Sequence, residues 1–106
     1  MTDKRLILTT TESKEQAQEI ARNLVENGLA ACVNIVGPVE SIFRWKGQVD
    51  TSSECLLIIK TTAEMFERVR DRIRSLHSYE LPECIQVPIE TGSAEYLKWI
   101  EESVKA

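Results

Sequence analysis

Two short stretches of this chain are apolar at consecutive positions, and they restrict its possible folds more than any other feature. Residues 6–8 read LIL and residues 56–59 read LLII. Side chains of a β-strand alternate between its two faces, so an unbroken apolar run presents apolar side chains on both. Both faces of the sheet that contains these strands must therefore be covered.

The first strand is predicted over residues 4–10, and a helix follows it. Ser13 and Gln16 have the spacing of a capping box, and Gly28 suits the left-handed position that ends a helix. The apolar residues between them keep helical spacing: Ala17, Ile20, Ala21, Leu24 and Val25. A second helix is predicted with Thr61 and Glu64 as its cap, ending near His77, with an apolar stripe of Phe66, Val69, Ile73 and Leu76.

Residues 30–61 predict one long β-hairpin. Gly37-Pro38 interrupts its first strand, where a bulge or bend is expected, and residues 46–53 supply the turn. Residues 84–90 alternate apolar and polar side chains, which predicts a half-buried strand that Pro88 places at a sheet edge. Gly92-Ser93 then opens a last helix with a broad apolar band: Tyr96, Leu97, Trp99, Ile100 and Val104.

The predicted order β-α-β-β-α-β plus a C-terminal helix indicates an α+β fold, a ferredoxin-like sandwich in one domain over residues 1–106. Two helices on such a sheet cover only one face. The C-terminal helix covers part of the other face, and a second copy of the chain covers more of it. We therefore expect a homo-oligomer whose sheets pack inward, with the hairpin as an arm toward a neighbouring subunit.

Composition excludes several functional classes. The chain has 106 residues, 42% of them apolar and 28% charged, and no apolar window is long enough to cross a membrane. The N-terminus lacks the apolar core of a secretory signal, so a cytoplasmic location is expected. The net charge of −4 and the lack of aromatic residues in the strands at residues 4–10 and 54–60 oppose nucleic-acid binding, including that of an RNA-recognition module.

Several motifs in their order along the chain resemble those of the CutA divalent-cation-tolerance family. They are AACVNI at residues 30–35, the W-x-G of residues 45–47, IIKTT at residues 58–62, the H-x-Y-x-x-P of residues 77–82 and YLKWI at residues 96–100. The resemblance implies a tight homotrimer, similar in architecture to the signal-transducing proteins of nitrogen regulation. It also implies a role in tolerance to copper and other divalent cations, with no reaction assigned.

The same resemblance implies positions for a copper site. Copper binding attributed to some members involves a cysteine at the end of the first strand and two adjacent histidines after the second helix. Thr9 and the pair Leu76-His77 occupy those positions here.

Copper and other soft or borderline divalent ions prefer imidazole and thiolate ligands, so His77 is the first candidate metal ligand. Cys32, Cys84 and Glu80 are further candidate donors, and a trimer can bring them from different subunits. The alternative role for His77 is a cap of the second helix.

A cleft at a subunit boundary, lined by Trp45, Lys60 and Tyr79 together with Cys32 and His77, would suit a divalent metal ion or a small anion. Its expected mechanism is sensing, in which bound ligand changes a surface that a partner protein recognises. Two alternatives stay open. One is a small-molecule enzyme using His77 with Cys84 or Cys32, and the other is an anion-sensing regulator without metal.

Overall fold

The computed structural model describes residues 2–105, and its secondary structure follows the predicted order. The elements are β1 (Lys4–Thr11), α1 (Lys14–Glu26), β2 (Cys32–Trp45), β3 (Gln48–Thr62), the short 3-10 turn η1 (Ala63–Met65), α2 (Phe66–Leu76), β4 (Ile85–Pro88) and α3 (Ala94–Ser103). The four strands form one antiparallel sheet in the order β2-β3-β1-β4. This topology confirms the α+β sandwich and the edge position of the strand that contains Pro88.

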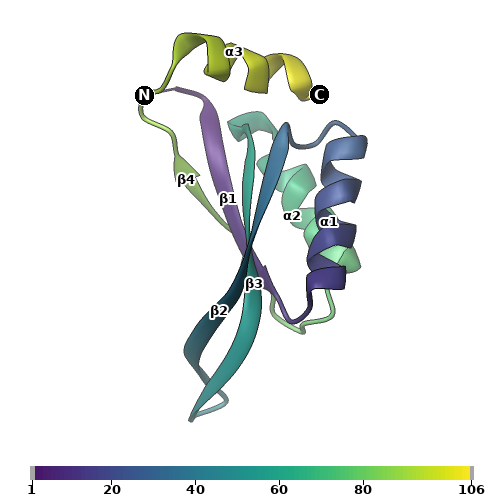
Figure 1. Cartoon of the computed structure of the whole chain (residues 1–106), viewed down its shortest axis with the longest axis vertical. Coiled ribbons are helices and arrows are strands. Elements are labelled where there is room, and N and C mark those ends of the chain that lie inside the picture. Colours follow the sequence, from purple (N-terminus) through teal and green to yellow (C-terminus); the bar gives the residue numbers. More distant parts are fainter. Residues whose placement is uncertain (1, 106) are drawn as a thin grey trace.

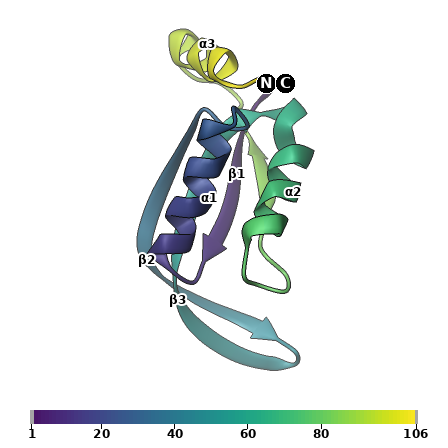
Figure 2. The same ribbon diagram turned by 90° about the vertical axis from the view of Figure 1, so that its right-hand side faces the viewer.

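Helices α1 and α2 lie side by side on one face of the sheet, and the main core lies between these two layers (Figures 1 and 2). The strands contribute side chains at alternate positions, and the fully buried ones include Ile7, Leu57 and Ile59. The helices contribute their apolar stripes to the same cluster: Ala17, Ile20 and Leu24 from α1, and Val69 and Ile73 from α2. We call this side of the sheet the covered face.

The opposite side, which we call the open face, carries the other half of the apolar side chains. Leu6, Leu8, Leu56 and Ile58 are only partly buried there. Two strands add exposed apolar residues in register with them: Val36, Ile85 and Val87. Helix α3 crosses one end of the sheet and leaves most of this face open (Figure 1).

The predicted half-buried strand is β4, and that prediction is wrong within a single copy of the chain, where all four of its residues are exposed. Ile85 is 52% exposed and Val87 is 40% exposed. Both side chains lie on the open face, where Ile85 pairs with Leu8 and Val87 with Leu6 in the sheet.

The β2-β3 hairpin extends well beyond the two helices (Figure 1), and the molecule measures 44 × 25 × 22 Å. The register shifts between Val36 and Val39, which confirms the bulge expected at Gly37-Pro38. The turn itself is shorter than predicted. Between β2 and β3 only Lys46 and Gly47 leave the strands, both with positive φ, as a two-residue type I′ turn requires. Residues 48–53 therefore belong to β3.

The helix ends agree with prediction in one case and not in another. Ser13 Oγ accepts a hydrogen bond of 3.1 Å from the Gln16 backbone N–H, and Gly28 adopts a φ of 72°, as expected for α1. Thr61 does not cap α2. Its side chain is buried and donates to the Leu29 carbonyl at 2.7 Å, because β3 continues to Thr62 and η1 precedes the helix. Within residues 2–105, no helix has the length and apolarity needed to span a membrane.

Candidate functional site

The connection that follows α2 begins with His77, whose two ring nitrogens both make hydrogen bonds. Nε2 lies 2.6 Å from the Thr10 carbonyl oxygen, and Nδ1 accepts from the Tyr79 backbone N–H at 3.0 Å. Because Nδ1 accepts, Nε2 carries the proton and donates to Thr10. The imidazole thus joins the end of β1 to the connection, and in this position neither nitrogen offers a free lone pair to a metal ion.

Tyr79 lies beside His77, with ring centroids 4.6 Å apart, and its hydroxyl donates to Glu54 Oε2 at 2.6 Å. Glu54 belongs to β3 and is only 7% exposed. Burial, followed by the bond to this carboxylate, raises the pKa of Tyr79 above its ordinary value. The phenol therefore stays a neutral donor that holds a buried carboxylate.

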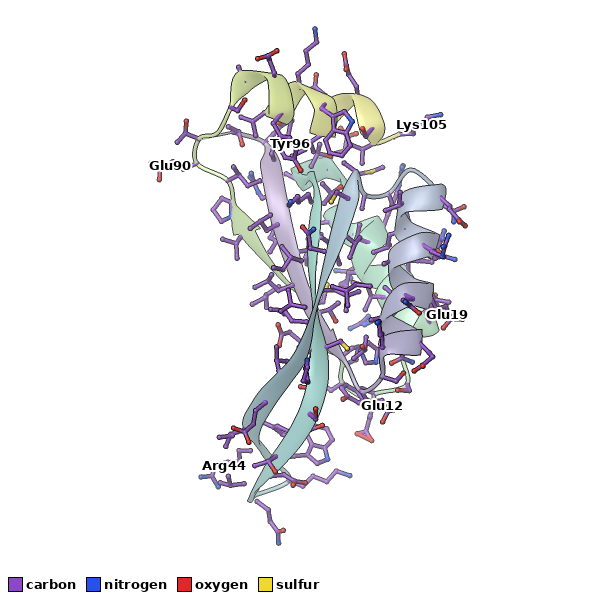
Figure 3. The ribbon with its side chains drawn as sticks, in the orientation of Figure 1. Glu12, Glu19, Arg44, Glu90, Tyr96 and Lys105 are labelled. Carbon is purple, nitrogen blue, oxygen red and sulfur yellow. The ribbon has the colours of Figure 1, made fainter. Side chains whose placement is uncertain are left out.

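Further polar side chains surround this pair on the side of α1. Ser78 Oγ lies 2.9 Å from Glu12 Oε1 and 3.3 Å from Gln16 Oε1, and it donates to one of them at a time. Glu12 lies at the base of α1, near the loop that follows α2 (Figure 3). Two carboxylates, Glu12 and Glu54, thus flank the connection and give it a negative potential.

Lys60 lies at the other end of β3. It pairs with Cys32 of β2 and with Leu6 of β1 in the sheet. Its Nζ is 3.4 Å from the Tyr96 hydroxyl and 5.6 Å from the centroid of that ring. Tyr96 descends from α3 over the end of the sheet (Figure 3). Lys60 is therefore a partly exposed cation set among aromatic and apolar side chains.

The candidate metal donors do not converge within one chain. Cys32 lies beside Lys60 of β3, and His77 contacts Thr10, which lies beside Leu56 of β3. Lys60 and Leu56 are four positions apart, so the two candidate donors are separated by about 13 Å along the strand. Glu80 is exposed on the connection. Residues 2–105 contain no group of three or more His, Cys, Asp or Glu side chains placed to hold a metal ion. The donor set of one chain therefore does not fit a divalent metal.

Two other candidate positions pack against the core, Cys84 partly buried and Thr9 fully buried. Cys84 packs against the core, and burial raises the pKa of its thiol despite Arg70 and Arg74 nearby. Thr9, at the position where some family members carry a ligand cysteine, faces the core, and its hydroxyl has no hydrogen-bond partner within residues 2–105. A thiol with a raised pKa is a weak metal ligand and a weak nucleophile at neutral pH.

The three residues expected to line a cleft also lie apart. Trp45 is at the hairpin turn, where it is 40% exposed and Lys46 Nζ lies 5.5 Å from its ring. Lys60 is about 40 Å away along β3, at about 3.3 Å per residue. Along β3, Tyr79 lies between Trp45 and Lys60, beside Glu54. A cleft that includes all three residues requires more than one copy of the chain.

Sequence reasoning did not single out Glu54 or the contact between Lys60 and Tyr96. Glu54 had a detectable signal, because it stands two residues before Leu56 and so shares a strand face with it. A carboxylate in phase with an apolar strand face is unusual and marks a buried polar contact.

Comparison with known proteins gives a consistent picture. Residues 5–103 match the CutA1 divalent ion tolerance protein family. The divalent-cation tolerance protein CutA of Thermus thermophilus is 46% identical over 98 residues, which cover 92% of this chain and 95% of that protein. Its counterpart from Archaeoglobus fulgidus is 44% identical over 99 residues, covering 93% and 96%.

A solved structure agrees with these sequence matches. The Cut A1 divalent cation tolerance protein of Thermus thermophilus superimposes with a TM-score of 0.94 at 44% identity and covers 96% of this chain and 99% of its own. The sequence identity, its coverage and the shared fold lead to one conclusion. This chain belongs to the CutA1 divalent ion tolerance family.

Proposed function

We propose that this protein acts in tolerance to divalent cations as a cytoplasmic homotrimer that binds a small ligand between its subunits and signals its presence. Catalysis is not part of this proposal. Three free cysteines, Cys32, Cys55 and Cys84, fit a reducing compartment.

The open face is the observation that carries this proposal. Leu8, Leu56 and Ile58 form the centre of an apolar surface that continues to the exposed Val36 and Ile85. A monomer that leaves such a surface in water loses the free energy of burying it, about 25 cal/mol per Å². Packing three such faces around a common axis recovers that free energy, and the projecting hairpin then reaches a neighbouring subunit.

The ligand site of this proposal lies at the subunit boundary, where Trp45, Lys60 and Tyr79 come from different copies. A small anion is favoured over a metal ion as the ligand that these side chains bind directly. Lys60 supplies a cation and Tyr96 a hydroxyl, whereas the ring nitrogens of His77 are both engaged. Ligand binding would change contacts of the hairpin, and a partner protein would recognise that change.

The first test is the assembly itself, measured by sedimentation at micromolar concentration. A trimer is expected for the unmodified protein and dissociation for Ile58→Asp, which places a charge on the open face. Val25→Asp, at an exposed position of α1 on the covered face, is the control for the charge alone. A folded monomer of the unmodified protein would refute the proposal.

The second test concerns metal. Calorimetric titration with Cu(II), Cu(I) and Zn(II) compares the protein with His77→Ala. We expect equal affinities, because the ring is held by Thr10 and Tyr79. A loss of affinity in the variant would place His77 in a metal site after all, and it would favour the metal ion over the anion as ligand.

The enzyme alternative depends on a reactive cysteine. Labelling of the native protein with a thiol reagent at neutral pH should be slow at Cys84, because burial raises its pKa. Rapid modification of Cys84 or Cys32 would support nucleophilic chemistry instead.

A further inference from the structure

We infer that Lys60 of one subunit forms an ion pair with Glu54 of the next, so that the Glu54–Tyr79 pair is one half of a site that a second copy completes. This inference rests on the homotrimer proposed above. It adds a specific contact to the assembly and identifies which residues meet.

Glu54 is the first half of this site. The residue is 7% exposed, and its described hydrogen bond is the one from the Tyr79 hydroxyl. The ion pairs within residues 2–105 join other residues, so no lysine, arginine or histidine lies within ion-pair distance of Glu54. Burying a carboxylate without a cation is costly, and covering the open face with another subunit would increase that cost.

Lys60 is the second half. Its side chain lies on the same face as Leu56 and Ile58, and its Nζ is 3.4 Å from the Tyr96 hydroxyl and 5.6 Å from the centroid of that ring. No carboxylate lies within ion-pair distance of its Nζ in the described part of the chain. A phenol and an aromatic ring stabilise an ammonium group less than a carboxylate does once water is excluded.

The two residues share one face of β3 but cannot meet within a chain. Glu54, Leu56, Ile58 and Lys60 alternate onto the open face, while Cys55 packs against the core. Lys60 lies six positions after Glu54 on the strand, which is roughly 20 Å at about 3.3 Å per residue. A side chain cannot span that distance, so any pair between them must join two copies.

Rotational symmetry permits this pairing when β3 runs across the symmetry axis, because rotation leaves each residue at its own height along that axis. In a closed ring of identical subunits, each copy presents one part of its surface to one neighbour and a different part to the other. Each subunit then offers Lys60 on one side and Glu54 on the other. Every buried charge on the open face of β3 finds a partner of opposite sign. An anion can reach Lys60 only when it replaces Glu54, which couples ligand binding to the subunit contact.

The experiment measures subunit exchange between isotopically light and heavy protein by native mass spectrometry. Lys60→Met and Glu54→Gln are each expected to exchange at least about tenfold faster than the unmodified protein, since each leaves a buried charge unpaired. The double variant should exchange no faster than either single variant. The reversed pair Glu54→Lys with Lys60→Glu should restore slower exchange.

The control variants are Lys14→Met and Glu19→Gln, which change exposed charges of α1, the helix that packs on the covered face. Glu19 is labelled in Figure 3. A zero-length amide cross-link between Lys60 and Glu54 in the mixed unmodified protein, found between light and heavy peptides, would show the contact directly.

The outcomes separate the two proposals. A trimer in which the single variants exchange at the unmodified rate, or in which their effects simply add, overturns the ion pair but leaves the homotrimer standing. A monomeric unmodified protein overturns both. Tenfold effects that do not add, together with the cross-link, support the pair.

Discussion

The two faces of the sheet have nearly the same apolar composition and very different surroundings. On the covered face, Ile7, Leu57 and Ile59 are completely buried under α1 and α2. On the open face, Leu8 and Ile58 alternate with them along the same strands and remain partly exposed. Composition alone therefore does not establish which side is the core of a subunit. One face is thus buried under two helices of the same chain, whereas the other stays accessible, and our proposal places that accessible face between subunits.

The sharpest test of this comparison uses two neighbouring isoleucines. Ile59→Ala on the covered face should lower the free energy of unfolding by about 3 kcal/mol, since it leaves a cavity in the core. Ile58→Ala on the open face should lower the free energy of unfolding of a single subunit by less. Because this variant weakens assembly, its loss of stability should grow with protein concentration. Urea denaturation at two protein concentrations measures both. Equal losses that do not depend on concentration would mean that the faces do not differ.

The polar contact of the open face is the next test. Tyr79→Phe removes the hydroxyl that donates to Glu54 and should lower the free energy of unfolding by about 2 kcal/mol, because a buried carboxylate loses its donor. Thermal denaturation gives the value. Tyr96→Phe is the matched control, since its hydroxyl makes only a 3.4 Å contact with Lys60 and should matter less.

The pH dependence of this contact has a definite sign. Because the pKa of Tyr79 is raised in the folded state, its stabilising contribution is fully present below the ordinary value of 10.0 and is lost as pH rises above it. Stability should therefore fall more steeply above pH 10 in the unmodified protein than in Tyr79→Phe. Parallel curves would indicate that the hydroxyl is not held by Glu54.

Helix α3 covers only one end of the open face, and Lys4 helps to fix it there. The Lys4 side chain is buried and contacts Asp3 and, at 3.1 Å, Glu101 of α3. Lys4→Met should lower the free energy of unfolding by about 1 kcal/mol or less, because both carboxylate partners are largely exposed. Hydrogen exchange in α3 should become faster, with the exposed Lys98→Met as control. Unchanged exchange would mean that apolar packing of Ile100 alone holds the helix.

The smallest expected effect is a gain on the covered face. Thr9 is buried with a hydroxyl that has no partner in the described part of the chain, so Thr9→Val should raise the free energy of unfolding by roughly 0.5–1 kcal/mol. Thr61→Val should instead lower it, because that hydroxyl donates to the Leu29 carbonyl. Chemical denaturation distinguishes the two signs. A loss in Thr9→Val would indicate an ordered water or another partner at that hydroxyl.

Local signals in the sequence predicted most of the fold. The Ser13 cap and Gly28 bound α1, and Gly37-Pro38 gives the bulge in β2. These features depend on residues within a few positions of each other. The predicted cap at Thr61 failed for the opposite reason, since its hydroxyl contacts Leu29, 32 positions away.

The candidate site was less predictable than the fold. His77 and Tyr79 are neighbours in sequence and in space, so the motif located them correctly relative to each other. The sequence did not reveal that both nitrogens of His77 are used by the backbone. It also did not reveal that Tyr79 reaches Glu54, which is 25 positions earlier. Side chains from distant segments meet only after the sheet and its connection have formed.

The order of elements, their approximate ends and the presence of two apolar strand faces were determined by the sequence itself, because alternation and capping act over a few residues. Tertiary structure decided which face α1 and α2 cover, how far α3 extends over the other, and which polar groups lie beside it. Those outcomes depend on packing between segments far apart in the chain. Lys60 and Glu54 share a strand face by alternation, but it is the folded structure of residues 2–105 that leaves both without a charged partner there.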